Sequence, residues 1–207
     1  MSERGAGEAS AVGSGSSLRL VVGLGNPGRR YAGTRHNTGF LVVGELGRQY
    51  GTGPVRERFQ GDVMEGQING TKVLFLAPGT CMNRSGRSVL AARDFYRLPP
   101  ESILVISDDV SLPVGQLRFR AGGSSGGQKG LGDIIRCLGT DRIPRLRIGI
   151  GSPPPRWEMA DYVLSQFTKE ELPEMERAVV RAAQAVTVWV NDGPTVCMNR
   201  YNMRGEC

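Results

Sequence analysis

Four short apolar runs, separated by longer segments with a helical repeat of apolar residues, most strongly limit the folds open to this chain of 207 residues. The runs are rich in β-branched residues and are bounded by Gly, Asn, Asp or Pro, as buried strands are. They cover Leu18–Val22, Lys72–Ala77, Ile103–Ser107 and Leu146–Ile150. We expect these runs to form the centre of a sheet.

The segments between and after these runs carry apolar residues at helical spacing. One contains Phe40, Val43, Leu46 and Tyr50 behind a Thr38 N-cap, a second contains Val89, Ala92, Phe95 and Tyr96, a third is Leu131–Leu138, and a last one runs from Leu172 to Trp189, with Gly193 placed to end it. Strands therefore alternate with helices. This order predicts an α/β fold: a single-domain, three-layer sandwich in which helices flank a mixed, mostly parallel, twisted sheet.

The N-terminal composition predicts where the folded domain begins, and the hydropathy pattern bears on its cellular location. Residues 1–17 are rich in Gly, Ser and Ala, which predicts a disordered tail before a domain that spans residues 18–207. No apolar run approaches the roughly 20 residues of a membrane span. We expect no membrane association and an intracellular location, either cytoplasmic or in the mitochondrial matrix, although Glu3 and Glu8 argue against a transit peptide.

Cysteine, histidine and charge content narrow the chemistry of any site. The four cysteines lack C-x-x-C spacing and the chain has one histidine, which predicts reduced thiols and disfavours a zinc site. The formal net charge is +6 and the sequence pI is about 9.5. This excess of positive charge is compatible with an anionic partner, although many basic proteins bind none.

A glycine motif after the first predicted strand permits two interpretations. The residues from Gly23 to Gly28 fit the G-x-G-x-x-G pattern of dinucleotide-binding folds, and Glu45 lies near the position of a ribose-binding acid. However, the next residues, RRYAGTRHNTG, predict a loop where a Rossmann fold needs a helix. In the interpretation that we favour, the glycines turn the chain and Asn26 offers its amide to a peptide-like group or an oxyanion.

His36, the only histidine, is the first candidate catalytic residue. It stands just before a helical pattern and can exchange protons near neutral pH, although most lone histidines are structural or solvated. Asp108 and Asp109 follow the run Ile103–Ser107, where sites gather in α/β sheets, and helix capping or turn formation is their alternative role. If one of them accepts a hydrogen bond from His36, the pair can activate water directly, because no G-x-S-x-G nucleophile motif is present.

Several motifs in this order resemble those of the bacterial-type peptidyl-tRNA hydrolase family, from Leu18 to about Tyr201. They are VVGLGNPG, Tyr31 followed by TRHN, CMNRSG, SDD-x-x-LP, GG-x-x-GG-x-KGL and RLRIGIG. The resemblance implies an enzyme that cleaves the ester between tRNA and a peptide or N-blocked aminoacyl group, and that recycles tRNA without a metal or organic cofactor. It also implies that His36 is the base, that Asp108 orients it, and that Asn26 contributes to catalysis.

The resemblance further implies a set of substrate-binding residues. Those that would contact the peptidyl end are Tyr31, Cys81, Met82, Asn83 and Lys129, and helix N-capping is the alternative role of Asn83. Arg120 and Arg147 match the positions that grip the 5′ phosphate of tRNA. Arg118 joins them, because it lies on the same side as Arg120 if the segment is extended. A solvated sheet face is the alternative for these arginines.

Two departures from the bacterial pattern bear on the expected site. Gln128-Lys129 stands where the family usually has His-Asn, and a charged Lys129 cannot accept a hydrogen bond. Lys129 is expected to stabilise developing negative charge or to contact RNA phosphate. Cys81 replaces a bulkier aromatic residue, which removes a packing surface from the cleft.

Three functional hypotheses follow from these residues. The leading one is a peptidyl-tRNA hydrolase, and the alternatives are a nucleotide-dependent oxidoreductase and a catalytically inactive RNA-binding protein. The leading hypothesis predicts a monomer that acts on peptidyl-tRNA, with ribosome-associated nascent chains as a further source of substrate.

Overall fold

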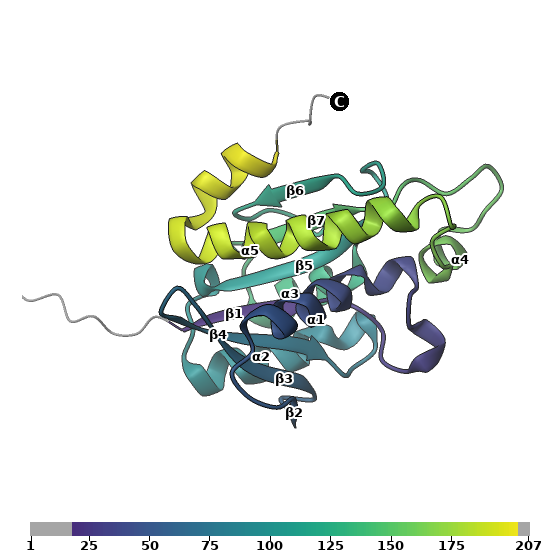
Figure 1. Ribbon diagram of the computed structural model, residues 1–207. Coiled ribbons are helices and arrows are strands. Elements are labelled where there is room, and N and C mark those ends of the chain that lie inside the picture. Colours follow the sequence, from purple (N-terminus) through teal and green to yellow (C-terminus); the bar gives the residue numbers. More distant parts are fainter. Residues whose placement is uncertain (1–17, 203–207) are drawn as a thin grey trace, which may run out of the picture.

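A single mixed sheet organises residues 18–202, the part of the chain that the computed structural model describes (Figure 1). Its seven strands lie in the order β2-β3-β4-β1-β5-β7-β6. Their bounds are Arg19–Gly23 (β1), Arg56–Arg58 (β2), Gly61–Ile68 (β3), Thr71–Pro78 (β4), Ile103–Asp109 (β5), Leu117–Arg120 (β6) and Arg145–Gly149 (β7). The tail predicted for residues 1–17 lies outside the described residues.

The inner strands of the sheet are the four apolar runs expected from the sequence. β4, β1, β5 and β7 are adjacent and run parallel to one another. Antiparallel pairing appears at both edges, where β2 and β3 extend the sheet beyond β4 and β6 pairs with β7. The predicted mixed sheet is therefore confirmed, with its parallel part in the interior.

Helices cover both faces of the sheet, as predicted (Figure 1). α1 (Thr38–Tyr50) and α5 (Leu172–Tyr201) bury one core against the sheet, while α2 (Ser85–Tyr96) and α3 (Lys129–Leu138) bury a second core on the other face. Because side chains alternate along a strand, β1 supplies Val21 to the first core and both Leu20 and Val22 to the second. The short α4 (Met159–Leu164) lies beside the turn that precedes α1.

Helix boundaries differ from the sequence expectations at two places. Thr38 is the first residue of α1 and not its N-cap, because a 3-10 turn, Arg35–Asn37, leads directly into the helix, and the Thr38 hydroxyl donates to the Arg35 carbonyl at 2.7 Å. Gly193 does break α5, with φ of 81°, but helix resumes after it with Pro194 in its first turn. None of the helices within residues 18–202 is long and apolar enough to cross a membrane.

A close approach of α1 to the sheet brings the turn before α1 to the carboxyl ends of the parallel strands. A Cβ at Gly39 would lie only 2.4 Å from the Leu24 nitrogen and 2.6 Å from the Ile106 oxygen. Glycine therefore allows the first turn of α1 to rest on the ends of β1 and β5. The residues just before Gly39 consequently lie beside those that end β5.

Candidate active site

His36 and Asp108 form a hydrogen-bonded pair at the carboxyl end of β5. His36 lies in the 3-10 turn Arg35–Asn37, and its Nδ1 is 2.8 Å from Oδ2 of Asp108. The histidine side chain is 13% exposed and the carboxylate 3% exposed, so the pair is shielded from water on the aspartate side and reachable on the histidine side. A carboxylate on Nδ1 favours the tautomer in which Nε2 is free to accept a proton.

Gln128 holds the other oxygen of Asp108. Its Nε2 donates to Asp108 Oδ1 at 3.2 Å, and its Oε1 accepts from the Leu131 backbone N–H at 2.7 Å as the N-cap of α3. The cap determines which end of the amide faces the carboxylate, because the oxygen is already occupied. Gln128 therefore presents a donor to Asp108. It is one of the residues at which the sequence departs from the bacterial pattern.

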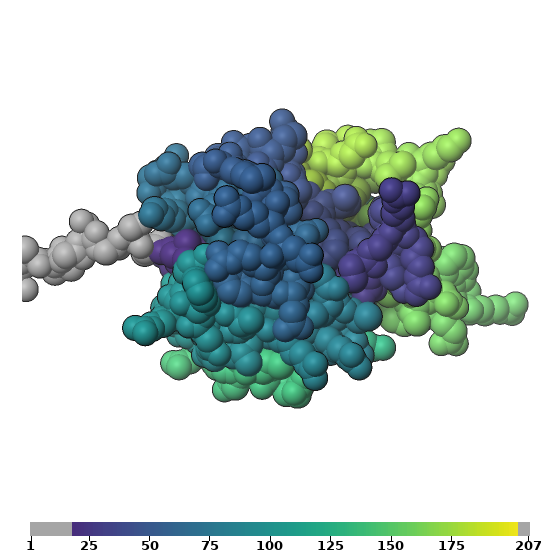
Figure 2. Space-filling model, turned by 90° about the horizontal axis from the view of Figure 1, so that it is seen from below, coloured from purple at the N-terminus to yellow at the C-terminus, as the bar shows by residue number. Residues whose placement is uncertain are grey.

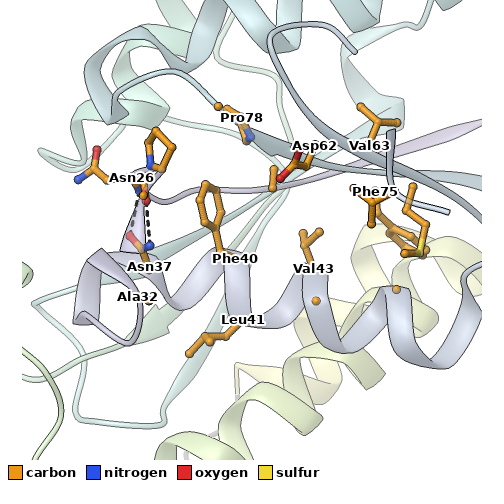
Figure 3. A pocket seen from close by; sticks show the side chains of 18 of the residues that line it. Asn26, Ala32, Asn37, Phe40, Leu41, Val43, Asp62, Val63, Phe75 and Pro78 are labelled. Carbon is orange, nitrogen blue, oxygen red and sulfur yellow. Dashed lines mark hydrogen bonds between the residues drawn. The ribbon is translucent and has the colours of Figure 1, made fainter. Parts of the chain in front are cut away.

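Asn26 is fixed by contacts on three of its groups. Its backbone N–H donates to Oδ1 of Asn37 at 2.9 Å, and its carbonyl accepts from Nδ2 of Asn37 at 3.0 Å (Figure 3). Its side-chain Oδ1 accepts from the Met82 N–H at 3.0 Å. Among the described residues, no group accepts a hydrogen bond from Nδ2 of Asn26. The amide therefore keeps its donors available for a bound molecule.

Met82 joins the two halves of this site. Its backbone N–H contacts Asn26, and its sulfur lies 3.3 Å from Nε2 of Gln128, which in turn contacts Asp108. A continuous set of contacts thus runs from His36 through Asp108, Gln128 and Met82 to Asn26. Four of these five residues were predicted as catalytic or substrate-binding.

The other predicted peptidyl-end residues lie outside this set of contacts. Cys81, Asn83 and Lys129 are exposed, and Asn83 follows Met82 in a 3-10 turn instead of capping α2, whose N-cap is Arg84. Tyr31 is half-buried, and the Arg30 guanidinium stacks 4.4 Å from its ring centroid. Within the described residues, the side chains of Asn83 and Lys129 make no hydrogen bond or ion pair, and both residues are exposed and thus accessible to a substrate.

The segment after β1 does not have the form of a dinucleotide site. After Gly23, the chain makes 3-10 turns at Arg29–Tyr31 and Arg35–Asn37 before α1 begins at Thr38. A Rossmann site needs a helix that starts directly at the glycine motif, because the N-terminus of that helix binds the pyrophosphate. The oxidoreductase hypothesis thus lacks its structural requirement.

Comparison with known proteins places this site in a family. The family model described as "Peptidyl-tRNA hydrolase" matches residues 20–206. The chain belongs to the peptidyl-tRNA hydrolase family. It is 55% identical to the peptidyl-tRNA hydrolase of Rhodopirellula baltica over 89% of this chain and 97% of that one. The Desulfitobacterium hafniense enzyme is 46% identical over 89% of this chain and 100% of that one.

A solved structure gives the same assignment. The crystal structure of peptidyl-tRNA hydrolase from Acinetobacter baumannii superposes with a TM-score of 0.84 at 38% identity, over 90% of this chain and 95% of that one. The predicted fold and family are therefore confirmed. The chain is a carboxylic ester hydrolase of the peptidyl-tRNA hydrolase family.

The arginines of this hydrolase gather on one face of β6 and β7. Arg118 lies opposite Arg147 and Arg120 opposite Arg145, so all four side chains start from the same face. Arg147 pairs with Oδ2 of Asp109 at 2.7 Å, whereas Arg120 is exposed. Asp109 therefore faces the arginines, and Asp108 is the carboxylate that meets His36.

Arg145 has a different role from its neighbours. Its guanidinium is buried and donates to the carbonyls of Ile143, Gly123, Ser124 and Asp141. Burial lowers the pKa of this guanidinium from its usual value. Arg145 thus anchors the glycine-rich loop that leads to Gln128 and is unavailable to a phosphate.

Arg35 ties the turn that carries His36 to a distant part of the chain. Its buried guanidinium donates to both carboxylate oxygens of Glu171, at 3.0 and 2.6 Å, and to the Ile150 carbonyl at 3.1 Å. It also stacks 4.5 Å from the ring centroid of Tyr162 in α4. In Figure 2, the purple segment around residues 25–35 accordingly borders the green segment that includes α4. These contacts of Arg35 fix the position of the neighbouring residue His36.

Glu171→Gln is expected to destabilise the fold by about 2 kcal/mol at pH 7, less than the roughly 3–5 kcal/mol of fully buried pairs because Glu171 is 25% exposed. Burial raises the pKa of Glu171, but hydrogen bonds from Arg35 and Thr168 outweigh it and hold the pKa below its ordinary 4.5. A depressed pKa stabilises the fold above the unfolded-state pKa, and this contribution is lost as the pH falls through the folded-state pKa. The wild-type advantage should therefore shrink below pH 4.5.

Denaturant unfolding at pH 7 and pH 4 measures this difference. The control is Glu174→Gln, which removes the exposed Arg177–Glu174 pair of α5 and should change the free energy of unfolding by less than about 0.5 kcal/mol. Equal effects of the two substitutions would contradict the assignment of Arg35–Glu171 as an anchor of the site.

Sequence reasoning missed three residues that position the site. Asn37 and Arg35 flank His36, yet their side chains bind the segments at Asn26 and Glu171. Gln128 was noted only as a departure from the family pattern. The single available signal was the composition of the Arg35-His36-Asn37 triplet, which places two strong hydrogen-bonding side chains beside the histidine.

Proposed function

We propose that His36, oriented by Asp108, is the base with which this enzyme activates the water that hydrolyses peptidyl-tRNA. Nε2 of His36 takes a proton from the water while the water oxygen bonds to the ester carbonyl carbon. The tetrahedral intermediate then loses the ribose oxygen of the tRNA, to which the His36 imidazolium returns the proton. The products are a peptide acid and a tRNA with a free terminal hydroxyl. The observation that carries this proposal is the 2.8 Å contact between His36 and the shielded Asp108.

Asn26 is the proposed donor to the developing oxyanion. Its Oδ1 is occupied by the Met82 N–H, whereas the donors on Nδ2 have no partner among the described residues. A pre-positioned donor of this kind contributes roughly 10²–10³ in rate. Asn83, Tyr31 and Cys81 are proposed to bind the peptidyl end, and Lys129 to contact the nearby RNA.

An assay with N-acetylaminoacyl-tRNA tests the proposal. We expect the wild-type chain to release the free acid, and intact-protein mass spectrometry after acid quenching to find the enzyme without a bound acyl group. An acyl adduct formed during turnover would contradict direct attack by water. Saturable tRNA binding without any turnover would favour the inactive RNA-binding alternative.

Gln128→Leu is expected to lower kcat about tenfold while KM stays within a factor of about two. The variant removes one hydrogen bond to a carboxylate, worth about 1.5 kcal/mol, and leaves Asp108 free to rotate away from His36. Steady-state hydrolysis measures both parameters. Gln128→Glu is the matched variant: its carboxylate would keep the α3 cap but would repel Asp108, so its kcat should fall at least as far. A change confined to KM would contradict the positioning role.

Arg120→Ala is expected to weaken tRNA binding about fivefold and to make the dependence of log Kd on log salt concentration shallower by about one. Arg120 is exposed on the arginine-bearing face, and we propose that it binds the 5′ phosphate of tRNA together with Arg147 and Arg118. Filter binding at several salt concentrations measures the slope. Lys72→Ala removes an exposed cation on β4, which three strands separate from β6 in the sheet, and should leave the slope unchanged.

We further propose that the enzyme acts as a monomer on peptidyl-tRNA, including nascent chains released at the ribosome. Its substrate arises in translation and the relatives named above are bacterial, which supports the bacterial cytoplasm as the site of action. The same relatives give no support to the mitochondrial alternative.

A further inference from the structure

A groove of about 780 Å³ lies between α1 and strands β3 and β4. Its apolar lining includes Phe40 and Val43 from α1, Met64 from β3, and Phe75 and Pro78 from β4 (Figure 3). The volume lies within the roughly 300–1,000 Å³ of small-molecule sites. The residues proposed for the reaction use only one end of this groove.

The chemistry of the groove fits apolar side chains better than RNA. Leu41 lines it and is 40% exposed, which is a cost in water for a large apolar side chain. The cationic lining residues are Arg29 and Arg48, and Arg48 is already paired with Glu45 at 2.6 Å. Asp62 adds a negative charge that a phosphate would have to approach. A molecule with apolar side chains and a polar backbone can contact both the apolar and the charged residues that line the groove.

One end of the groove is the Asn26–Asn37 pair. The groove therefore begins at the residue whose free Nδ2 is proposed to bind the ester carbonyl. The two parts of the substrate must leave this ester in different directions. The arginines lie on β6 and β7 at one edge of the sheet, whereas the groove lies on β3 and β4 toward the other edge.

We propose that this groove binds the apolar side chains of the peptide in peptidyl-tRNA, upstream of the residue that carries the ester. The inference rests on the proposed function, because it takes the ester to lie at Asn26. It adds a preference: among substrates with the same tRNA and the same esterified residue, the enzyme cleaves longer apolar peptides most efficiently.

Gly44 allows the groove to be filled with little disturbance of the fold. It lies in α1, lines the groove, and a Cβ added there would meet no heavy atom within 4 Å. Gly44→Trp therefore places a large side chain in open space, and glycine is a poor helix former that tryptophan replaces without loss of helix propensity. Gly44→Ala is the matched control, because it makes the same backbone change and leaves the groove open.

Three substrates separate the peptide contribution from the chemistry: N-acetyl-Gly-tRNA, and the same tRNA carrying N-acetyl-Leu-Leu-Leu-Leu-Gly or N-acetyl-Ser-Ser-Ser-Ser-Gly. For wild type and Gly44→Ala, we expect kcat/KM to be about tenfold higher for the leucine peptide than for the other two. For Gly44→Trp, this preference should disappear while N-acetyl-Gly-tRNA is cleaved at the wild-type rate. If Gly44→Trp fails to fold, Leu41→Glu provides the same test from the exposed rim.

The outcomes distinguish the two proposals. Equal kcat/KM for the three substrates in wild type, or a leucine preference that survives Gly44→Trp, would overturn the groove assignment and leave the proposed function intact. Failure of wild type to cleave all three substrates would overturn both. If sedimentation shows a wild-type dimer that Gly44→Trp dissociates with no change in substrate preference, the groove binds a second copy and the peptide assignment is wrong.

Discussion

Hydrolysis of N-acetylaminoacyl-tRNA should slow by roughly 10²–10⁴ in His36→Ala, because that is the usual contribution of a positioned base. In the described part of the chain, no other histidine can replace it. The rate that remains should come from Asn26 and from substrate binding, as it does in other hydrolases that lose their base. Single-turnover kinetics measure the chemical step directly.

The control for His36→Ala is a variant that keeps the contact to Asp108. In His36→Gln, the side-chain amide can still donate to the carboxylate, so the fold and the Asp108 position should be preserved while the base is absent. Both variants should bind tRNA within about twofold of wild type, since the proposed phosphate contacts lie on β6 and β7. A hydrolysis rate near that of wild type in either variant would rule out His36 as the base.

The interior of the fold was predictable because its strands are buried on both faces. The runs that became β1, β4, β5 and β7 are mostly apolar, and such runs stand out in a sequence. β2 and β3 escaped notice for two reasons: the edge strand β2 is three residues long, and buried and exposed positions alternate along β3, so neither forms an apolar run. Polar residues on the exposed side of an edge strand look like those of a loop.

The candidate site was predictable residue by residue but not as a set of contacts. Motifs singled out His36, Asp108 and Asn26, yet the partners of these side chains are far away in the sequence, as in the contact of Asn26 with Met82, 56 residues away. Gln128 lies 20 residues beyond Asp108 and reaches it only because the loop before α3 returns to the end of β5. No periodicity in the sequence reports such a return, so the role of Gln128 required the structure.

Asp108→Asn should lower kcat by a factor that approaches about 10⁴, although the asparagine side chain has nearly the same shape as the aspartate. A loss of this size is seen when the aspartate of a Ser-His-Asp hydrolase becomes asparagine. Gln128 explains why. Its Oε1 is held by the Leu131 N–H, so its Nε2 must face position 108 and will bind the oxygen of the new amide. The amide NH₂ then faces Nδ1 of His36, which must accept a hydrogen bond, and the imidazole proton moves to Nε2, where the base is needed.

This explanation makes the effect of Asp108→Asn depend on Gln128. Adding Gln128→Leu frees the asparagine to turn its oxygen toward His36, so the double variant should recover about tenfold in kcat over Asp108→Asn, although Gln128→Leu alone lowers kcat. Asp109→Asn is the matched control: Asp109 pairs with Arg147 and not with His36, so kcat should stay within about threefold of wild type while tRNA binding changes. Additive losses in the double variant would instead show that Gln128 acts on Asp108 only through packing.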